Sequence, residues 1–195
     1  MLKFAAAVFF LIITPGPGVL TTAGVGAGFG ARPGLIFVIG LFIGTNLVAL
    51  AVVTGLAGVL FSVPYLRGAL FAISAIYLLY LAAKVGFSGA KIGFMATPKA
   101  PGLAGGVMLQ LINPKAYAVN TMMFTGFNYW PGNLAAELIT KFLIMNAIWV
   151  PLHLAWLWAG VALHRLDLAP RVQRRINLAM AAAMVLVVVL AVLAG

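Results

Sequence analysis

Cysteine is absent from this chain and acidic residues are almost absent. Without cysteine among the 195 residues, disulfides, thiol redox chemistry and thiolate metal sites are excluded. Aspartate and glutamate together number 2, Glu137 and Asp167, which is too few for a carboxylate metal site. The two histidines, His153 and His164, have no acidic neighbours that would complete one. With no base, nucleophile and acid constellation visible either, we expect no metal, no cofactor and no enzyme.

Charge of either sign is scarce as well. Charged residues make up 7% of the chain and hydrophobic residues 65%, whereas a soluble domain carries about 25% charged residues. A water-soluble fold is therefore excluded. The net charge of +10 would indicate nucleic acid in a soluble protein. Here most basic residues fall between apolar segments, where they meet anionic lipid headgroups and set the orientation in the membrane.

Long apolar runs are what the chain has instead. A helix that crosses a bilayer needs about 20 apolar residues. Six segments satisfy this requirement: Phe4–Ala23, Leu35–Phe61, Leu66–Val85, Leu103–Phe127, Leu138–Leu163 and Ile176–Leu193. The sequence predicts an all-α integral membrane protein with six transmembrane helices.

The first segment has an alternative interpretation as a signal peptide. Lys3 and the apolar run Phe4–Ile13 fit that shape, and Thr21-Thr22-Ala23 is an acceptable cleavage site. Pro-Gly-Pro-Gly fits a signal sequence poorly, so we expect the segment to be the first membrane helix.

Basic residues predict the orientation of the helices. The side that follows helices 1, 3 and 5 holds eight of them: Arg32, Lys84, Lys91, Lys99, Arg165, Arg171, Arg174 and Arg175. The opposite side holds three, Lys3, Arg67 and Lys141. We therefore expect the first side to face the cytoplasm and both termini to face outward.

The chain divides into two halves of three helices, residues 1–85 and 103–195, joined by a cytoplasmic loop over residues 86–102. Because three is odd, the halves enter the membrane in opposite directions, which is the inverted repeat of many secondary transporters. Two internal matches favour duplication: Pro15 and Pro114, like Asn46 and Asn146, lie about 100 residues apart. Chance spacing in an apolar chain is the alternative.

The first predicted helix is broken at Thr14-Pro15-Gly16-Pro17-Gly18. Each proline removes a backbone donor, and loose backbone in a bilayer is tolerated only where it is buried in protein or lines a wet cavity. Freed amides at the start of a half-helix attract anions, and freed carbonyls at the end of one attract cations. The break predicts a site for a zwitterion; a simple kink is the alternative.

The fourth predicted helix is broken at Asn113-Pro114-Lys115. Lys115 lies about 18 Å from either end of its segment, too far for easy escape to water. No acid in any segment is available to pair with it. We expect a cation that faces an internal cavity and binds a carboxylate, with Asn113 as a bridging amide; snorkelling through a thinned membrane is the alternative.

Three further polar side chains lie at membrane depth. Asn46 and Asn146 either hold a substrate amino group or join helices to each other. His153 is the candidate for proton coupling, or a structural histidine. Gly40 and Gly44 predict a helix-packing face.

At these residues the chain resembles the LysE/RhtB family of amino-acid exporters. Four stretches carry the resemblance: the first-helix break at residues 14–18, Ala75–Leu81 in the third helix, Leu111–Lys115, and Arg175-Ile176-Asn177 at the last helix. Departures are Phe124–Phe127, where the family commonly has Pro-Gln-Phe, and Asn146, where it often has an aspartate.

The resemblance implies a six-helix inner-membrane protein that exports amino acids by proton exchange, with roles for Pro15, Gly16, Pro17, Asn113, Pro114 and Lys115. Because no membrane acid balances a second positive charge, we expect a small neutral amino acid or related carboxylate. Alternatives are export of another small solute, such as an ion or organic acid, and a non-transporting membrane subunit. The expected partners are this substrate and the lipid bilayer, not nucleic acid, and a homodimer stays open.

Overall fold

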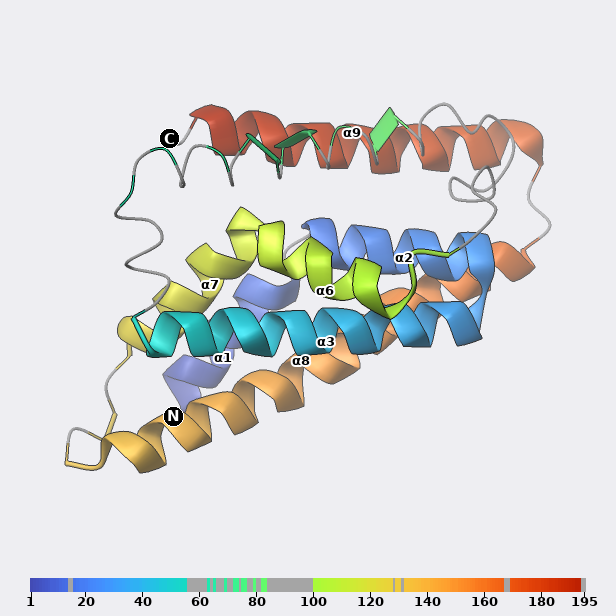
Figure 1. The fold of residues 1–195 in the computed structure, drawn as a ribbon. Coiled ribbons are helices and arrows are strands. Elements are labelled where there is room, and N and C mark those ends of the chain that lie inside the picture. Colours follow the sequence, from blue (N-terminus) through green and yellow to red (C-terminus); the bar gives the residue numbers. More distant parts are fainter. Residues whose placement is uncertain are drawn as a thin grey trace.

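A computed structural model of the chain describes residues 1–13, 16–55, 100–127, 129–130, 132–166 and 169–193, with isolated positions between 63 and 83. Every element in the described part is a helix, which confirms the all-α prediction (Figure 1). The helices are α1 Leu2–Ile13, α2 Pro17–Phe29, α3 Ala31–Val53, α6 Gly102–Ile112, α7 Pro114–Thr125, α8 Leu134–Arg165 and α9 Pro170–Leu193. Most of the third predicted segment, Leu66–Val85, and most of the loop over residues 86–102 lie outside the described residues.

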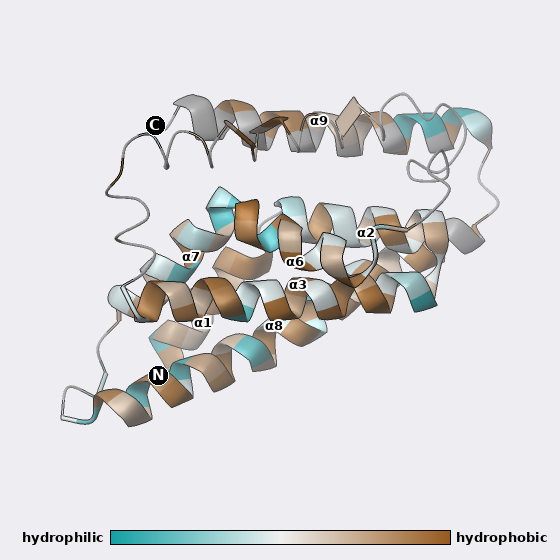
Figure 2. Ribbon diagram, viewed as in Figure 1, coloured by the Kyte–Doolittle hydropathy of each residue, from teal (hydrophilic) through white to brown (hydrophobic). Residues whose placement is uncertain are grey.

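Two described helices are long and apolar enough to cross a membrane, at Ala31–Val53 and Leu134–Leu163. The pair α1 and α2, bent by 54°, makes a third such span if it is counted as one. Helix α6 is apolar but shorter. Hydrophobic positions dominate the ribbons, and hydrophilic ones gather on α6 and α7 and where α9 begins (Figure 2). These features fit a multi-pass membrane protein; six spans in two inverted halves stay a prediction.

Several helices begin or end away from the predicted boundaries. Helix α2 continues past Ala23 to Phe29 and ends at Gly30, whose φ of 80° is open to glycine but unfavourable for other residues. Helix α9 begins at Pro170 instead of Ile176, because proline is well suited to a first helical position. Three arginines expected in the connection before Ile176 therefore lie on the first turns of α9, namely Arg171, Arg174 and Arg175, and Arg165 ends α8.

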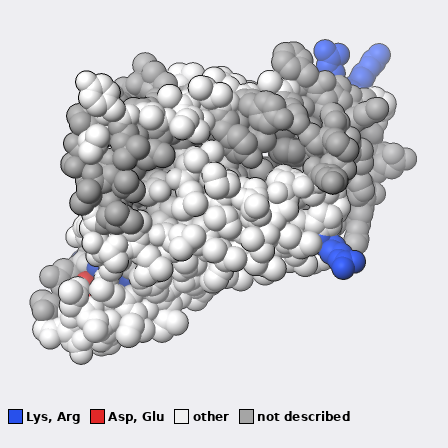
Figure 3. Space-filling view, viewed as in Figure 1, with Lys and Arg blue, Asp and Glu red and all other residues white. Residues whose placement is uncertain are grey.

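Exposed arginines mark one end of the molecule as its basic end. On the face drawn in Figure 3, blue side chains project where α3 and α9 begin, a small blue and red patch lies at the opposite end, and the middle of the face is uncharged. Arg32 at the start of α3 is exposed there, and so are Arg171, Arg174 and Arg175 on the first turns of α9. This arrangement agrees with the predicted excess of positive charge on one side of the membrane.

Glycine allows α2 and α8 to approach at the level of their backbones. The two helices run in parallel, since Gly18 lies against His153 while Gly26 lies against Leu157 and Ala23 against Gly160. Every residue of α2 from Pro17 to Gly28 is buried. The glycine run of α2 thus serves close helix packing.

Helices α3 and α6 form a second parallel pair of the same kind. As predicted, Gly40 and Gly44 are the packing positions: Gly40 faces Leu103 and Gly106, and Gly44 faces Val107 and Gln110. Small residues of this type let membrane helices pack closely. The pairing determines where Gln110 lies along α3, which is near the middle of that helix.

Substituting Gly160 by alanine is expected to destabilise the protein. The new Cβ would overlap the backbone carbonyl of Ala23, which cannot rotate away, so we expect a loss of about 1–3 kcal/mol despite the better helix propensity of alanine. The thermal midpoint of the purified protein in detergent measures this. Gly132→Ala is the matched control, because a Cβ there meets nothing within 4 Å. Equal midpoints for both variants would contradict the packing argument.

Candidate functional site

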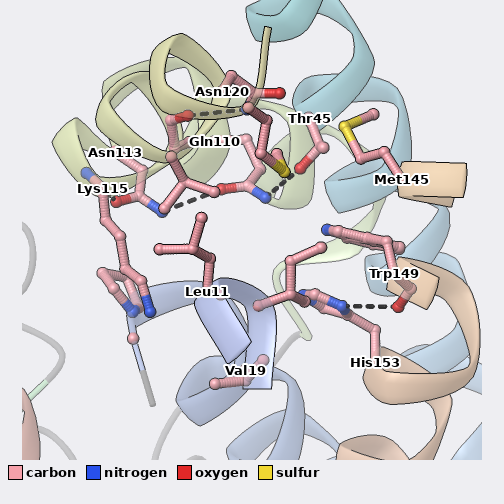
Figure 4. Close-up of a pocket in the computed structure, with 17 residues that line it drawn as sticks. Leu11, Val19, Thr45, Gln110, Asn113, Lys115, Asn120, Met145, Trp149 and His153 are labelled. Carbon is pink, nitrogen blue, oxygen red and sulfur yellow. Dashed lines mark hydrogen bonds between the residues drawn. The ribbon is translucent and has the colours of Figure 1, made fainter. Parts of the chain in front are cut away.

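A cavity of about 60 Å³ lies where the start of α2, the α6–α7 junction and the middles of α3 and α8 meet (Figure 4). The structure brings together six of the predicted site residues on its lining: Gly16, Pro17, Gly18, Asn113, Lys115 and His153. Thr14 and Pro15 lie outside the described residues. Pro114, Asn46 and Asn146 are not on the lining. Both predicted breaks therefore contribute to one site.

Lys115 is placed by the break between α6 and α7. Asn113 ends α6 with an extended backbone (φ −81°, ψ 107°), and Pro114 begins α7. The Asn113 side chain caps α7 by accepting a hydrogen bond from the Lys115 amide, at 3.1 Å. The Lys115 side chain then lies over Gly16: a Cβ on Gly16 would be 2.8 Å from its Cδ and 3.0 Å from its Nζ. Glycine at position 16 is thus what makes room for the lysine.

The first turn of α2 faces the same end of the cavity. No side chain caps this helix at Gly16, whereas α7 is capped by Asn113. The first amides of a helix have no acceptor within it and carry partial positive charge. The α2 N-terminus and the Lys115 ammonium therefore create a positive end that suits a carboxylate.

Amide side chains form a hydrogen-bonded chain from α7 to α3. Asn113 donates through Nδ2 to Gln110 Oε1 at 3.0 Å, and Gln110 donates through Nε2 to the Thr45 hydroxyl. All three side chains are buried. The sequence interpretation missed Gln110 and Thr45. Gln110 stands three residues before Asn113, which is one helical turn, and that spacing was the available signal.

Asn120 is a second residue that the sequence interpretation missed. Its Nδ2 donates to the Ala116 carbonyl at 2.7 Å, which fixes the orientation of the amide. The Oδ1 atom is buried without a hydrogen-bond partner in the described part of the chain. Because a buried acceptor without a partner is costly, this oxygen suits a water molecule or a ligand in the cavity.

His153 forms the other side of the cavity from Lys115 (Figure 4). Its ring stacks on Trp149 with centroids 3.6 Å apart and an interplanar angle of 14°. Its Nδ1 lies 3.0 Å from the Trp149 carbonyl. A carbonyl only accepts hydrogen bonds, so Nδ1 carries a hydrogen, and Nε2 is the atom left to face Gly18.

Apolar side chains make up much of the remaining lining. They come from α1, α2, α7 and α8: Leu11, Ile12, Val19, Val119, Met123 and Met145. These apolar walls can contact an aliphatic group of a ligand, and they offer no counter-ion to a second positive charge on it. Methionine adapts its shape readily, so these walls also suit a change in cavity volume.

Asn46 and Asn146 hydrogen-bond to each other away from this lining. Asn46 Nδ2 donates to Asn146 Oδ1 at 3.1 Å, and Asn146 Nδ2 donates to Asn46 Oδ1 at 2.9 Å. Asn46 Nδ2 also donates to the Phe42 carbonyl. The pair joins α3 to α8 in the described state.

A buried ion pair lies at the start of α8. Lys141 and Glu137 are 1% and 4% exposed, and Lys141 Nζ lies 2.7 Å from Glu137 Oε1. The lysine also donates to the carbonyls of Phe124 and Phe127, and Glu137 Oε2 accepts from the amides of Tyr129 and Trp130. Lys141, counted above among the three basic residues of the side opposite the predicted cytoplasmic one, is thus paired with Glu137 inside the protein.

Comparison with known proteins finds two curated relatives. A leucine efflux protein of Enterobacter sp. is 29% identical over 130 residues, which cover 64% of this chain and 61% of the relative. A leucine efflux protein of Klebsiella pneumoniae is 27% identical over 131 residues, covering 65% and 62%. No family model matches the chain, and no solved structure matches it. The chain spans about three fifths of the length of the curated relatives it matches, and its similarity to these efflux proteins supports the resemblance to LysE/RhtB exporters.

Proposed function

We propose that the protein is a secondary transporter that exports a small neutral amino acid with an aliphatic side chain across the cytoplasmic membrane. One observation carries the proposal: a cavity with Lys115 and the α2 N-terminus on one side and the acceptor atom of His153 on the other. An amino acid brings a carboxylate for the first and an ammonium for the second. Both relatives are named leucine efflux proteins, which agrees with an amino-acid substrate.

The charge of the cavity favours a neutral amino acid over lysine or arginine. Its described lining carries the Lys115 ammonium and no carboxylate. A substrate with a second positive charge would have to be desolvated without a counter-ion, which is costly in a membrane interior. The apolar walls formed by residues such as Val119 and Met123 suit an aliphatic side chain.

The proposal includes the six-helix inverted repeat with outward termini and proton exchange as the driving reaction. Three features support it: the two parallel pairs α2–α8 and α3–α6, the reciprocal bond between Asn46 and Asn146, and the basic end of the molecule. Substrate would bind between the broken first and fourth helices near the midplane, as broken helices do in many transporters.

In the described conformation the cavity is too small for a whole amino acid. A volume of about 60 Å³ has room for only a few water molecules. We expect the flexible side chains of Met123 and Met145 to move apart when an aliphatic amino acid enters.

Counterflow in proteoliposomes tests the function. The purified full chain is reconstituted with unlabelled leucine inside, and uptake of labelled leucine from outside is measured. We expect exchange of leucine, with competition by other aliphatic amino acids and little competition by lysine. Exchange of none of the neutral amino acids would refute the proposal. A non-transporting subunit would give that result, and an exporter of another solute would exchange only that solute.

A further inference from the structure

We propose that Gln110 Oε1 and His153 Nε2 form the subsite for the substrate ammonium, and that a proton on His153 Nε2 excludes the substrate. This inference rests on the proposed export of an amino acid and adds two things to it. It assigns the partners of the amino group, and it gives the step by which proton and substrate exchange. The evidence is the geometry around Gly18.

Gly18 leaves an open point between the two acceptors. A Cβ on Gly18 would lie 3.6 Å from His153 Nε2, 3.9 Å from Gln110 Nε2 and 4.0 Å from Gln110 Oε1, at ordinary van der Waals distances. Since glycine carries no Cβ, a ligand atom near this point can contact both side chains. Gly18, Gln110 and His153 all line the cavity. Gly16, which lies against Lys115, also lines it and is two residues before Gly18 at the start of α2. The acceptor side and the positive side are thus neighbours.

The hydrogen-bond chain determines which atom of Gln110 can accept. The Lys115 amide must donate, so it fixes Asn113 Oδ1 as its acceptor and leaves Asn113 Nδ2 as a donor. Asn113 Nδ2 therefore binds Gln110 Oε1, and Gln110 Nε2 binds Thr45. A carbonyl-type oxygen has two lone pairs, and one of those on Oε1 is left for an ammonium.

The Trp149 carbonyl determines the role of each nitrogen in His153. Nδ1 donates to that carbonyl in both protonation states, so Nε2 is the atom that gains and loses the proton. Neutral His153 presents a lone pair at Nε2 and accepts a bond from an ammonium. Protonated His153 presents an N–H and a positive charge, so it can neither accept that bond nor tolerate a second cation.

Proton and substrate therefore compete for one atom. Lys115 of α7 is the charged side chain that faces His153 across the cavity; α2 and α6 carry no charged residue. On the other packed helices, Lys3 of α1 and Arg32 of α3 are not on the lining, and Lys141 and Glu137 lie about 18 Å and about 24 Å from His153 along α8. When the ammonium leaves on one side of the membrane, Nε2 is free to take a proton there. The exchange is then one proton for one zwitterion.

His153→Gln tests the coupling, because glutamine keeps an acceptor and cannot titrate in this range. Wild-type proteoliposomes should show leucine counterflow that slows as the pH is lowered, and leucine movement driven by a pH gradient. In His153→Gln we expect slower counterflow whose rate no longer depends on pH, and loss of gradient-driven movement. Gradient-driven movement equal to that of the wild type would overturn the inference. Failure of wild-type counterflow would instead refute the proposed function.

Gly18→Ala tests the ammonium subsite independently of titration. The methyl group fits without overlap but fills the point between Gln110 and His153. Competition against labelled leucine is compared for unlabelled leucine and for 4-methylpentanoate, which lacks the amino group. The wild type should prefer leucine strongly, and in Gly18→Ala we expect that preference to fall by about tenfold or more, since a hydrogen bond to a charged group is lost.

The matched control is Gly132→Ala, whose Cβ meets nothing within 4 Å. It should keep the wild-type preference for leucine over 4-methylpentanoate. An equal loss of affinity for both compounds in Gly18→Ala would overturn the ammonium subsite, because it would indicate a general loss of space. The ratio remains measurable if His153→Gln fails to fold.

Discussion

Replacing Lys115 by methionine is expected to reduce export strongly while the protein still inserts in the membrane. Methionine fills a similar volume over Gly16 but removes the positive charge from the carboxylate side of the cavity. The lost charge-assisted hydrogen bond should lower transport at limiting leucine by about tenfold to hundredfold. Leucine counterflow in proteoliposomes measures the effect, with the amount of reconstituted protein determined in parallel.

Lys3→Met is the matched control for this substitution. Lys3 lies exposed on the first turn of α1, so the same loss of charge there should leave counterflow unchanged. Gly16→Ala should give an intermediate loss, because its Cβ would displace the Lys115 side chain without removing the charge. Wild-type counterflow in Lys115→Met would contradict the role given to this lysine.

Replacing Lys141 by methionine should cause the largest loss of stability among the substitutions considered. Lys141 neutralises Glu137 inside the protein and holds the carbonyls of Phe124 and Phe127. Without it the carboxylate stays buried without a counter-charge and those carbonyls lose a donor. We expect the ratio of folded to unfolded protein to fall by about a hundredfold or more. Thermal midpoints and the monodisperse fraction in detergent measure the change.

The double substitution Glu137→Gln with Lys141→Met separates charge from packing. Glutamine is neutral and keeps an acceptor for the amides of Tyr129 and Trp130. If the buried charge dominates, the double variant should be more stable than Lys141→Met alone. A double variant that is less stable than both single variants would contradict this explanation.

The sequence predicted the breaks and the end of the α6 helix because proline acts locally. Pro114 has no amide hydrogen and restricts the residue before it, so α6 ends at Ile112 and Asn113 becomes extended. The place of Lys115 next to the break follows from the same restriction. Local chemistry therefore revealed half of the cavity.

The other half depends on the packing of distant helices. Gln110 and Thr45 meet because Gly40 and Gly44 set the height of α6 on α3. No pattern within one helix specifies that height. Sequence patterns could not decide the role of Asn46 and Asn146 either, because the two side chains can hydrogen-bond to a substrate or to each other across two helices. In the structure the two amides satisfy each other.

The backbone contacts at Gly160 and Gly40 also bear on how the proposed transporter would change state. Helices in contact along their backbones have no layer of side chains that can re-pack, so sliding is strongly opposed. We expect α2 with α8, and α3 with α6, to move as two rigid bodies. The amide pair Asn46–Asn146 joins one body to the other and would serve as the pivot about which they rock.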